Sequence, residues 1–478
     1  MKKLKLLAGM FACVVFASGA FGDVLSLDDY INMIEKNNSD LISIQANIDA
    51  VQGKILEADR VYAAYFTAGA SYTKDDSGRP FNPLAQTNEI QNTSYDASLS
   101  KLFGTGTKIT LGFNGSRTFY DYTGFPNFDV TDLGPYIGLE QSLLQGLGGG
   151  ATKAGVLKAQ ADARSALYLL EYKKQSVLLN ARMAYWQLSY ARTVVDFRKT
   201  SLDRTKKILD WNQRRFDMDL AEKADLLQAQ AAYKMGDLNL RLAQQNEVQA
   251  SRNFNGFLNS SDEKVMFDVQ PFSEVGDNFT QADKELVKRG QRADVLSALE
   301  DVKSAEQAAI VSRKSIGQDL VLTGQYGLNG VDLDYAVARD YVLNGNKPSY
   351  TIGLRYTLPL DFSNRSAISK GYESAKISAE QAAKSAQIKE SNDWLGLVSN
   401  WENAKERLGL SKQILGVQQN LVDENQRLLS KGRTTTYYVL QSEQSLDDST
   451  LNVYQNILEL VGIYEQANAF YNSSDIIK

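Results

Sequence analysis

The most constraining feature of this chain is an internal duplication. Residues of the first half recur in the second half at nearly constant offsets. The matched pairs are Asp40 with Asp294, Ser43 with Ser297, Tyr72 with Tyr326, Ile137 with Ile352, Leu139 with Leu354, Trp186 with Trp401, Leu227 with Leu440 and Asn255 with Asn468. Both halves run in the order short helix, strands, two very long helices, and few functions need strands combined with helices of such length.

Composition excludes several classes of function. The 478 residues are 43% hydrophobic and 23% charged, which is typical of an ordered protein. A net charge of -5 argues against nucleic acid as the main partner. The chain has no His and one Cys, Cys13, which removes Ser-His and Cys-His nucleophile pairs and sites with Cys or imidazole ligands. We therefore expect no enzymatic activity, no cofactor and no metal site.

The N-terminus has the pattern of a secretory signal peptide over residues 1–22. Basic residues precede an apolar run over 6–16, and small residues at 20 and 22 permit a cut before Asp23. Cys13 lies inside the apolar run, so the sequence favours a discarded signal residue over a lipid anchor. No later stretch offers 18 apolar residues, so we expect no transmembrane helix after the signal.

Several segments alternate apolar and polar residues with a period of two, as half-buried strands do. They are 66–73, 95–100, 109–114 and 350–358, with weaker alternation over 135–143 and 319–329. One face is apolar and the other carries Lys108, Glu140 and Arg355, the pattern of a barrel with lipid outside and water inside. These three residues are the candidates for a barrel lumen. A soluble sheet packed on the rest of the protein would show the same alternation.

Two long segments carry apolar residues seven positions apart, which indicates supercoiled helix pairs. The first series is Ala181, Leu188, Val195, Leu202, Leu209 and Phe216, and the second is Trp394, Trp401, Leu408, Leu415, Val422 and Leu429. Residues 151–216 and 364–431 would each form a helix of roughly 100 Å. The return helices, 223–258 and 436–472, are shorter. Helices 40–63 and 293–316, stacked end to end on them, would complete hairpins about 100 Å long.

Two strand-to-helix junctions and two helical turns carry a resemblance to a known family. The junctions are GLEQSLLQG over 138–146 and GLRYTLPL over 353–360, and the turns are RFDMDL over 215–220 and KGRTTT over 431–436. Together with the duplication and the order and lengths of the segments, they resemble the TolC-like outer-membrane efflux proteins over the whole mature chain.

The resemblance implies a mainly α protein with a transmembrane β part, built from duplicated strand–long-helix units. Three copies would pool their strands into an outer-membrane β-barrel and their helices into a trimeric α-barrel, a tunnel across the periplasm. The hairpin turns would form the tunnel mouth, where a periplasmic adaptor (a membrane fusion protein) docks and a proton-driven or ATP-driven inner-membrane pump delivers substrate. The expected location is the outer membrane, in contact with its lipid, with the signal peptide removed.

The resemblance also places gate and docking residues at the two turns. The gate candidates are Asp217, Asp219, Asp225, Tyr438 and Gln441, and the adaptor-docking candidates are Phe216, Met218, Leu220, Gly432, Arg433 and Thr434. The first turn departs from the family, because Asp219 stands where Gly is usual. Tyr438 and Gln441 stand where some members have Asp rings, so the acids of the first turn could supply the gate instead. A solvated acidic turn explains those acids equally well.

The predicted organisation has four parts. A signal peptide (1–22) precedes the first repeat (23–260), with helices over 26–63, strands over 64–144 and a long hairpin over 151–258. A linker (261–280) leads to the second repeat (281–478), with helices over 281–316, strands over 318–360 and a hairpin over 364–472. The aromatic residues Phe119, Tyr120, Tyr122, Phe125 and Phe128 fit either an interfacial girdle or a surface loop between strands, and the acidic residues among them favour the loop.

The two repeats differ in their strands. The first half has four strand candidates and the second has two, and the extra pair spans 94–118. If this pair joins the barrel, a trimer has eighteen strands, against twelve in the usual family barrel. The pair could instead lie outside the barrel, and the sequence leaves both arrangements open.

Two functions follow as hypotheses. The leading one is the outer-membrane exit channel of a tripartite efflux or type I secretion system. The competing one is an exported, non-channel coiled-coil structural or adaptor protein with a soluble sheet. The transported substrate, the pump and the adaptor are not encoded in any motif of this chain.

Overall fold

The structure is a computed structural model that describes residues 24–82, 85–265, 267–272, 286–288 and 290–470. The predicted signal peptide, including Cys13, lies outside these residues. The chain divides into two compact units. One, which we call the helical unit, comprises the described residues within 24–42, 175–288 and 396–469, and the other, the sheet unit, comprises those within 43–174 and 290–395 together with residue 470. Each unit takes pieces from both sequence repeats, and the division into repeats stays a prediction.

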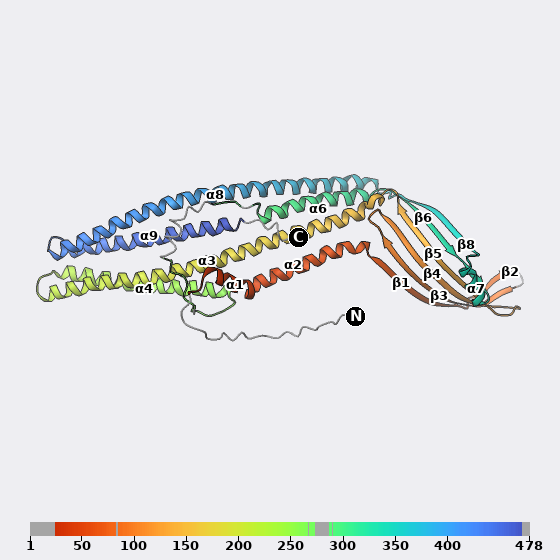
Figure 1. Cartoon of the computed structure of the whole chain (residues 1–478), viewed down its shortest axis with the longest axis horizontal. Coiled ribbons are helices and arrows are strands. Elements are labelled where there is room, and N and C mark those ends of the chain that lie inside the picture. The colour runs from red at the N-terminus through yellow and green to blue at the C-terminus, as the bar shows by residue number, and fades with distance from the viewer. Residues whose placement is uncertain (1–23, 83–84, 266, 273–285, 289, 471–478) are drawn as a thin grey trace. The chain divides into compact units, whose positions relative to one another are not determined.

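Four long helices build the two hairpins (Figure 1). Helices α3 (Gly150–Asp217) and α8 (Phe362–Ser430) are continuous over 68 and 69 residues. Helices α4 (Lys223–Phe257) and α9 (Thr436–Asn468) return over 35 and 33 residues. No Pro interrupts any of the four, which permits such lengths. The heptad positions Leu188 and Leu408 are buried, as a supercoiled pair requires.

Shorter helices precede the strands in both halves. They are α1 (Leu27–Asn37), α2 (Ser39–Ala58), the 3-10 turn η1 (Asp59–Tyr62) and α6 (Ala293–Ser315). Asn38 caps α2, because its side-chain oxygen accepts from the backbone N–H groups of Asp40 and Leu41. Its amide donates to the carbonyl of Phe257 at 2.9 Å, so the end of α4 lies beside the start of α2.

The position equivalent to Asn38 in the second repeat is Arg292. It also connects the start of a short helix to neighbouring segments, but through different contacts. Arg292 precedes α6 and pairs with Asp294 at 2.7 Å and with Asp393 of α8 at 2.8 Å. Its guanidinium also lies 5.2 Å from the ring centroid of Phe470, just beyond α9. The start of α2 is therefore held by a neutral amide, whereas the start of α6 is held by ion pairs and a cation–π contact.

The core of the helical unit holds the N-terminal segment against α3 and α4. Tyr30 of α1 stacks on Phe254 of α4 with ring centroids 4.0 Å apart and donates its hydroxyl to the Phe254 carbonyl at 2.9 Å. Tyr185 of α3 donates to the carbonyl of Leu25 at 2.6 Å. Burial raises the pKa of the Tyr30 phenol far above its ordinary value, so this ring stays neutral.

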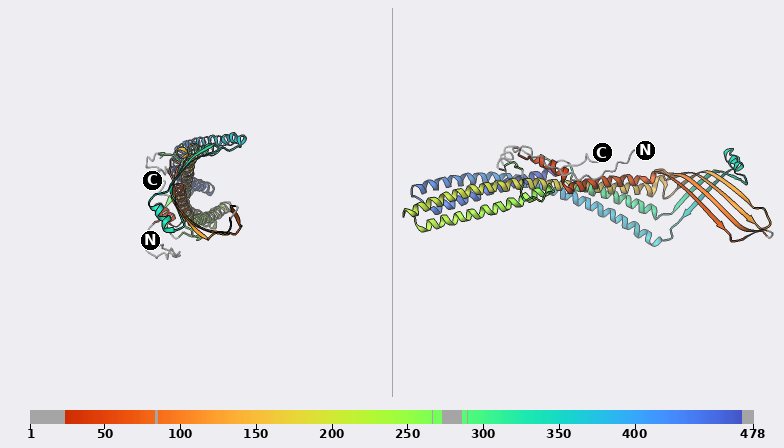
Figure 2. Two further views of the ribbon diagram at one scale, coloured as in Figure 1. Left: turned by 90° about the vertical axis from the view of Figure 1, so that its right-hand side faces the viewer. Right: turned by 90° about the horizontal axis from the view of Figure 1, so that it is seen from below.

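The strands form one antiparallel sheet in the sheet unit. Six long strands run in the order β1 (Ala64–Asp75), β3 (Ala85–Leu102), β4 (Thr107–Tyr122), β5 (Phe128–Ser142), β6 (Asp319–Leu328), β8 (Pro348–Thr357). The short β2 (Arg79–Asn82) pairs with β3, and the short β7 (Gly330–Asp332) pairs with β5. Figure 2 shows the six strands as one curved sheet, and β1 and β8 are its edges. The extra pair predicted over 94–118 therefore belongs to the sheet.

The register gives the sheet two distinct faces. Residues opposite one another point to the same side, so Phe66, Leu99, Leu111, Ile137 and Tyr326 share one face across five strands. Ser98, Gly112, Thr110, Glu140 and Thr323 share the other. The predicted alternation is confirmed, and we call the two sides the apolar face and the polar face.

One sequence expectation within the strand ranges was wrong, and one element was not predicted. The unpredicted element is helix α7 (Tyr335–Leu343), which lies between the strand candidates 319–329 and 350–358, and Asp334 caps it by accepting from Ala336 N–H at 2.7 Å. Of the five aromatic residues predicted in a loop, Phe119, Tyr120, Tyr122 and Phe128 lie in β4 and β5, and only Phe125 lies in the turn. The strands extend this far because β4 pairs with β5 up to Tyr120 opposite Phe128 and with β3 up to Tyr122 opposite Thr87.

Among the described residues, no helix is long and apolar enough to cross a lipid bilayer.

Candidate functional site

The three lumen candidates lie together on the polar face of the sheet. Lys108 of β4 is directly opposite Glu140 of β5. Arg355 of β8 reaches Glu140 across β6, with its Nη2 3.3 Å from the carboxylate Oε1. Glu140 and Arg355 lie close to the ends of their strands that lead into α3 and α8, and Lys108 lies at the start of β4, after the turn from β3. Strands β4, β5 and β8 thus present two cations around one carboxylate on the polar face.

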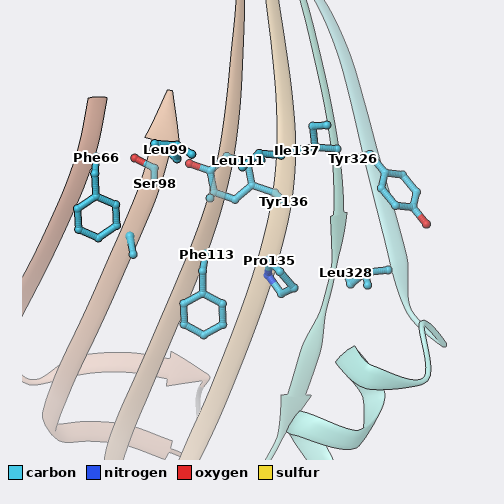
Figure 3. Close-up of a pocket in the computed structure, with 12 residues that line it drawn as sticks. Phe66, Ser98, Leu99, Leu111, Phe113, Pro135, Tyr136, Ile137, Tyr326 and Leu328 are labelled. Carbon is cyan, nitrogen blue, oxygen red and sulfur yellow. The ribbon is translucent and has the colours of Figure 1, made fainter. Parts of the chain in front are cut away.

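The opposite side of the sheet is apolar and exposed. Figure 3 shows Phe66, Leu99, Leu111, Phe113 and Ile137 around a shallow depression of the apolar face. These side chains are exposed although they are large and apolar, and Ile352 on the edge strand β8 exposes 77% of its surface. A contiguous apolar patch across a whole sheet marks a surface that something apolar covers.

The first hairpin turn, residues 215–222, ends α3 with a left-handed residue. Asp219 has a φ of 56°, although it is not Gly. The N–H of Leu220 donates to the carbonyl of Arg215 at 2.8 Å, and the N–H of Asp219 donates to Phe216 at 3.0 Å. This pair of bonds is the Schellman arrangement, which places a left-handed residue just past the helix end.

The second hairpin turn, residues 428–435, has the same geometry. The N–H of Arg433 donates to Leu428 at 2.9 Å, the N–H of Gly432 donates to Leu429 at 3.0 Å, and Gly432 has a φ of 67°. Asp219 therefore occupies the conformation that Gly432 occupies in the second repeat. Asp tolerates this region better than most residues, which explains how the first turn keeps its shape without Gly.

The structure brings most docking candidates to the surface at these two turns. Both turns lie at one end of the helical unit (Figure 1). Met218 and Leu220 expose 64% and 62% of their surface, and Gly432 and Arg433 are exposed, whereas Phe216 and Thr434 are half-buried. Exposed apolar side chains at a helical turn are available to a partner.

The gate candidates do not form one cluster. Asp217 is exposed and accepts from the Gln213 amide at 2.9 Å, and Asp225 is half-buried in the first turn of α4. Tyr438 is exposed, whereas Gln441 lines a groove between α3, α4 and α9 together with Gln228. The acidic candidates and the α9 candidates thus belong to different hairpins of the chain, and their role as a gate stays a prediction.

Sequence reasoning missed a row of ion pairs between α3 and α9. Arg204 binds Glu443 at 2.8 Å and Asp447 at 2.6 Å, and Arg198 also binds Asp447, at 3.3 Å. Further along, Arg182 binds Glu465 at 3.1 Å. The three acids are buried, and we call this row the α3–α9 seam. Burial raises the pKa of the Asp447 carboxyl, and hydrogen bonding from Ser201 together with the two arginines opposes that rise.

The seam has a weak sequence signal. Buried acids on a helix with apolar heptads indicate that a neighbouring helix supplies cations. The sequence does not identify those cations, because the partners are more than 200 residues apart in the chain. The described residues contain no group of acidic, His or Cys side chains that could hold a metal ion.

Comparison with known proteins gives a fold assignment. No family model and no curated protein matches the sequence. Solved structures match at low identity but over nearly the full chain. The outer membrane protein VceC of Vibrio cholerae has a TM-score of 0.66 and 13% identity, covering 93% of this chain and 95% of its own. CusC, whose structures concern transmembrane channel formation, has a TM-score of 0.63 and 11% identity, covering 94% and 92%.

The MtrE outer membrane channel of Neisseria gonorrhoeae, solved in its open state, has a TM-score of 0.61 and 12% identity, covering 93% of this chain and 88% of its own. The duplicated helical hairpins and the antiparallel sheet of this chain are thus shared with several outer-membrane proteins over most of their length. The chain has the fold of the TolC-like outer-membrane efflux proteins.

Proposed function

We propose that this protein is an outer-membrane exit channel that three copies of the chain form together. The proposal rests mainly on the exposed surfaces of the sheet. Its apolar face is exposed on every long strand, its opposite face is polar, and each edge strand pairs on one side only within the described part of the chain. An open sheet with an exposed apolar face is stable only when lipid covers the face and other strands pair with the edges.

The edges are suited to pairing with copies of the same chain. Strand β1 runs away from the helices and β8 runs toward them, so β8 of one copy and β1 of the next would pair antiparallel. A second exposed surface supports the same assembly. Leu410, Ile414, Val417 and Leu421 form an exposed apolar stripe on α8, at helical spacing. Helix α4 exposes Leu227, Met235, Leu238 and Leu242, which a neighbouring copy could cover.

In this proposal the helical hairpins form a periplasmic tunnel, and the two hairpin turns are its mouth. A periplasmic adaptor would dock at the exposed turn residues, and an inner-membrane pump would deliver substrate there. The chain itself would catalyse no reaction. The proposed location is the outer membrane, with the hairpins extending into the periplasm, after removal of residues 1–22.

A direct test is to purify the full chain in detergent and measure its mass and its conductance in planar bilayers. We expect an assembly of three copies that forms ion-conducting pores. A monomer without pores would overturn the proposal. The competing function, an exported coiled-coil protein with a soluble sheet, predicts that the protein stays in solution without detergent and separates from the outer membrane on fractionation.

A further inference from the structure

The central hairpin of the sheet, β3 with β4, is integrated on both sides. Strand β3 pairs with the whole of β1, from Ala64 opposite Lys101 to Asp75 opposite Ile90. Strand β4 pairs with β5 from Thr107 opposite Gln141 to Tyr120 opposite Phe128. The hairpin cannot leave the sheet without breaking two ladders, because it is the only connection between β1 and β5 in the described sheet.

The hairpin also continues both faces of the sheet without interruption. On the apolar face, Tyr95 and Leu99 of β3 and Leu111 and Phe113 of β4 expose between 40% and 55% of their surface. On the polar face, Ser94 of β3 donates to or accepts from Ser71 of β1 at 2.8 Å. A hairpin outside the membrane would not need an exposed apolar face opposite a polar face, as its neighbouring strands have.

The connection between β7 and β8 does not cover the polar face. Gly330 of β7 is opposite Leu133, a residue of the apolar face. A Cβ on Gly330 would lie 2.0 Å from the carbonyl oxygen of Ala338 in α7, so α7 packs on that same side. Gly69, Gly134 and Gly353 lie on the polar face, opposite Asp96, Asn114 and Thr323. The side chains of Asp96 and Thr323 occupy the space over Gly69 and Gly353.

We infer that all six long strands enter the barrel wall, so that the proposed three-copy channel has an eighteen-stranded barrel with a wide, water-filled lumen. This inference rests on the proposed function. Six strands per chain is an even number, so each edge meets its neighbour antiparallel around the whole barrel. With strands about 4.8 Å apart and tilted by about 40°, eighteen strands give a backbone diameter of about 36 Å.

The width bears on the class of cargo. Four strands per chain would give twelve strands and a diameter of about 24 Å by the same geometry. Barrels of 16–18 strands keep an aqueous channel, because side chains no longer meet at the axis. The β-barrel is therefore not the size-limiting part of this duct, and it accommodates bulky, hydrated polar solutes.

The first experiment compares single Cys variants labelled with a fluorophore in lipid vesicles. Cys13 is the only native Cys and lies in the predicted signal peptide, so the mature chain supplies a clean background. Ala97→Cys (apolar face) and Ser98→Cys (polar face) test β3, and Ile352→Cys and Thr351→Cys are the matched pair on β8. We expect lipid-borne quenchers to act at 97 and 352 and aqueous iodide to act at 98 and 351.

The outcomes separate the two proposals. Iodide quenching at 97 together with lipid quenching at 352 would place the hairpin outside the barrel and overturn the inference alone. Iodide quenching at both 97 and 352 would overturn the proposed channel itself.

The second experiment counts strands by electron cryomicroscopy. Residues 76–127 are replaced by Asn-Gly, a two-residue hairpin turn, which sets Asp75 opposite Phe128. In this register Phe66 is opposite Ile137, and these two residues stay on the apolar face. We expect eighteen strands in the full chain and twelve in the shortened one, whose diameter falls by about a third. Twelve strands in the full chain would refute the inference, even if the shortened chain does not fold.

Discussion

Asp219 and Gly432 adopt the same backbone conformation although they are different residue types. Both stand at the left-handed position of a Schellman turn, with φ of 56° and 67°. A Cβ at Gly432 would meet no heavy atom within 4 Å, so any cost of substitution there comes from the backbone and not from a clash. Gly reaches this region freely, whereas an L side chain pays a strain that is smallest for Asn and Asp.

The first prediction concerns this strain. Gly432→Ala should destabilise the second turn by about 1 kcal/mol, and Asp219→Gly should leave the first turn as stable or slightly more stable. Asp219→Asn is the matched control and should change little, because Asn tolerates the same region. Amide hydrogen exchange across residues 428–436 and 215–222 measures the local opening. Equal exchange in wild type and Gly432→Ala would contradict the expected strain.

The second prediction concerns docking at the same residue. Gly432→Trp should abolish export through the proposed adaptor contact while leaving assembly and pore formation intact, because the position is exposed and its surroundings are open. Gly432→Ala shares the backbone strain without the bulk and should still export. Export of a pump substrate from cells, with the oligomer checked in detergent, gives the comparison. Normal export by Gly432→Trp would show that the adaptor does not dock at this turn.

At the scale of the elements, the α3–α9 seam distinguishes one pairing of long helices from the others. Arg182, Arg198 and Arg204 face acids on α9. The equivalent positions on α8 are Leu397, Gln413 and Gln419, and the equivalents of the three acids on α4 are Gln230, Lys234 and Arg252. The two repeats share their apolar heptads but not these charges. The seam therefore favours α3 as the helix that packs against the acids of α9. If α8 occupied the position of α3, the buried acids would have no cation, because α8 lacks the three arginines.

The third prediction is that Arg204→Met destabilises the protein by about 3 kcal/mol at neutral pH, because it leaves two buried carboxylates short of a cation. Urea unfolding measures the loss. Lys199→Met on the same helix removes only an exposed pair with Asp196 and should cost less than about 0.5 kcal/mol. Similar losses in both variants would show that the seam adds nothing beyond a surface ion pair.

The same variant has a predicted pH dependence. Burial already raises the pKa of Asp447, so the folded state holds this proton at pH values where the unfolded chain has lost it. Stability from this group is present below the ordinary Asp pKa and is lost as pH rises through the folded value. Without Arg204 the folded pKa should rise further. Arg204→Met should therefore lose less stability at acidic pH than at neutral pH, and a pH-independent loss would contradict this.

At the scale of the whole molecule, one chain forms only part of its proposed functional surface. The sheet has two edges and an exposed apolar face, and α8 and α4 each expose an apolar stripe. Each of these surfaces is unfavourable in water and becomes favourable when copies and lipid cover it. Assembly would also repeat the group formed by Lys108, Glu140 and Arg355 around the lumen.

The fourth prediction uses that group. Arg355→Glu should shift the proposed pore toward cation selectivity, because it turns an excess of one positive charge per copy into an excess of one negative charge. The reversal potential of planar bilayers under a KCl gradient measures the shift. Arg339→Glu on α7, which packs on the apolar side of the sheet, is the control and should have no effect. An unchanged reversal potential in Arg355→Glu would remove these residues from the ion path.

Periodicity is a local property, and the sequence alone determined what depends on it. The period of two placed Leu111 and Ile137 on one face of strands, and the period of seven placed Leu188 and Leu408 on the buried side of long helices. The duplication determined the order of the elements, and the fold comparisons confirm the architecture that this order predicted.

Only the tertiary structure decided which distant segments meet. It placed the extra hairpin inside the sheet, joined Arg204 to Asp447 across more than 200 residues, and revealed α7 between the two strand segments of the second half. The alternation of a strand is the same in any sheet, and a heptad helix accepts any apolar partner. Pairing partners depend instead on register and on buried charge, which arise only when segments from the two repeats come together.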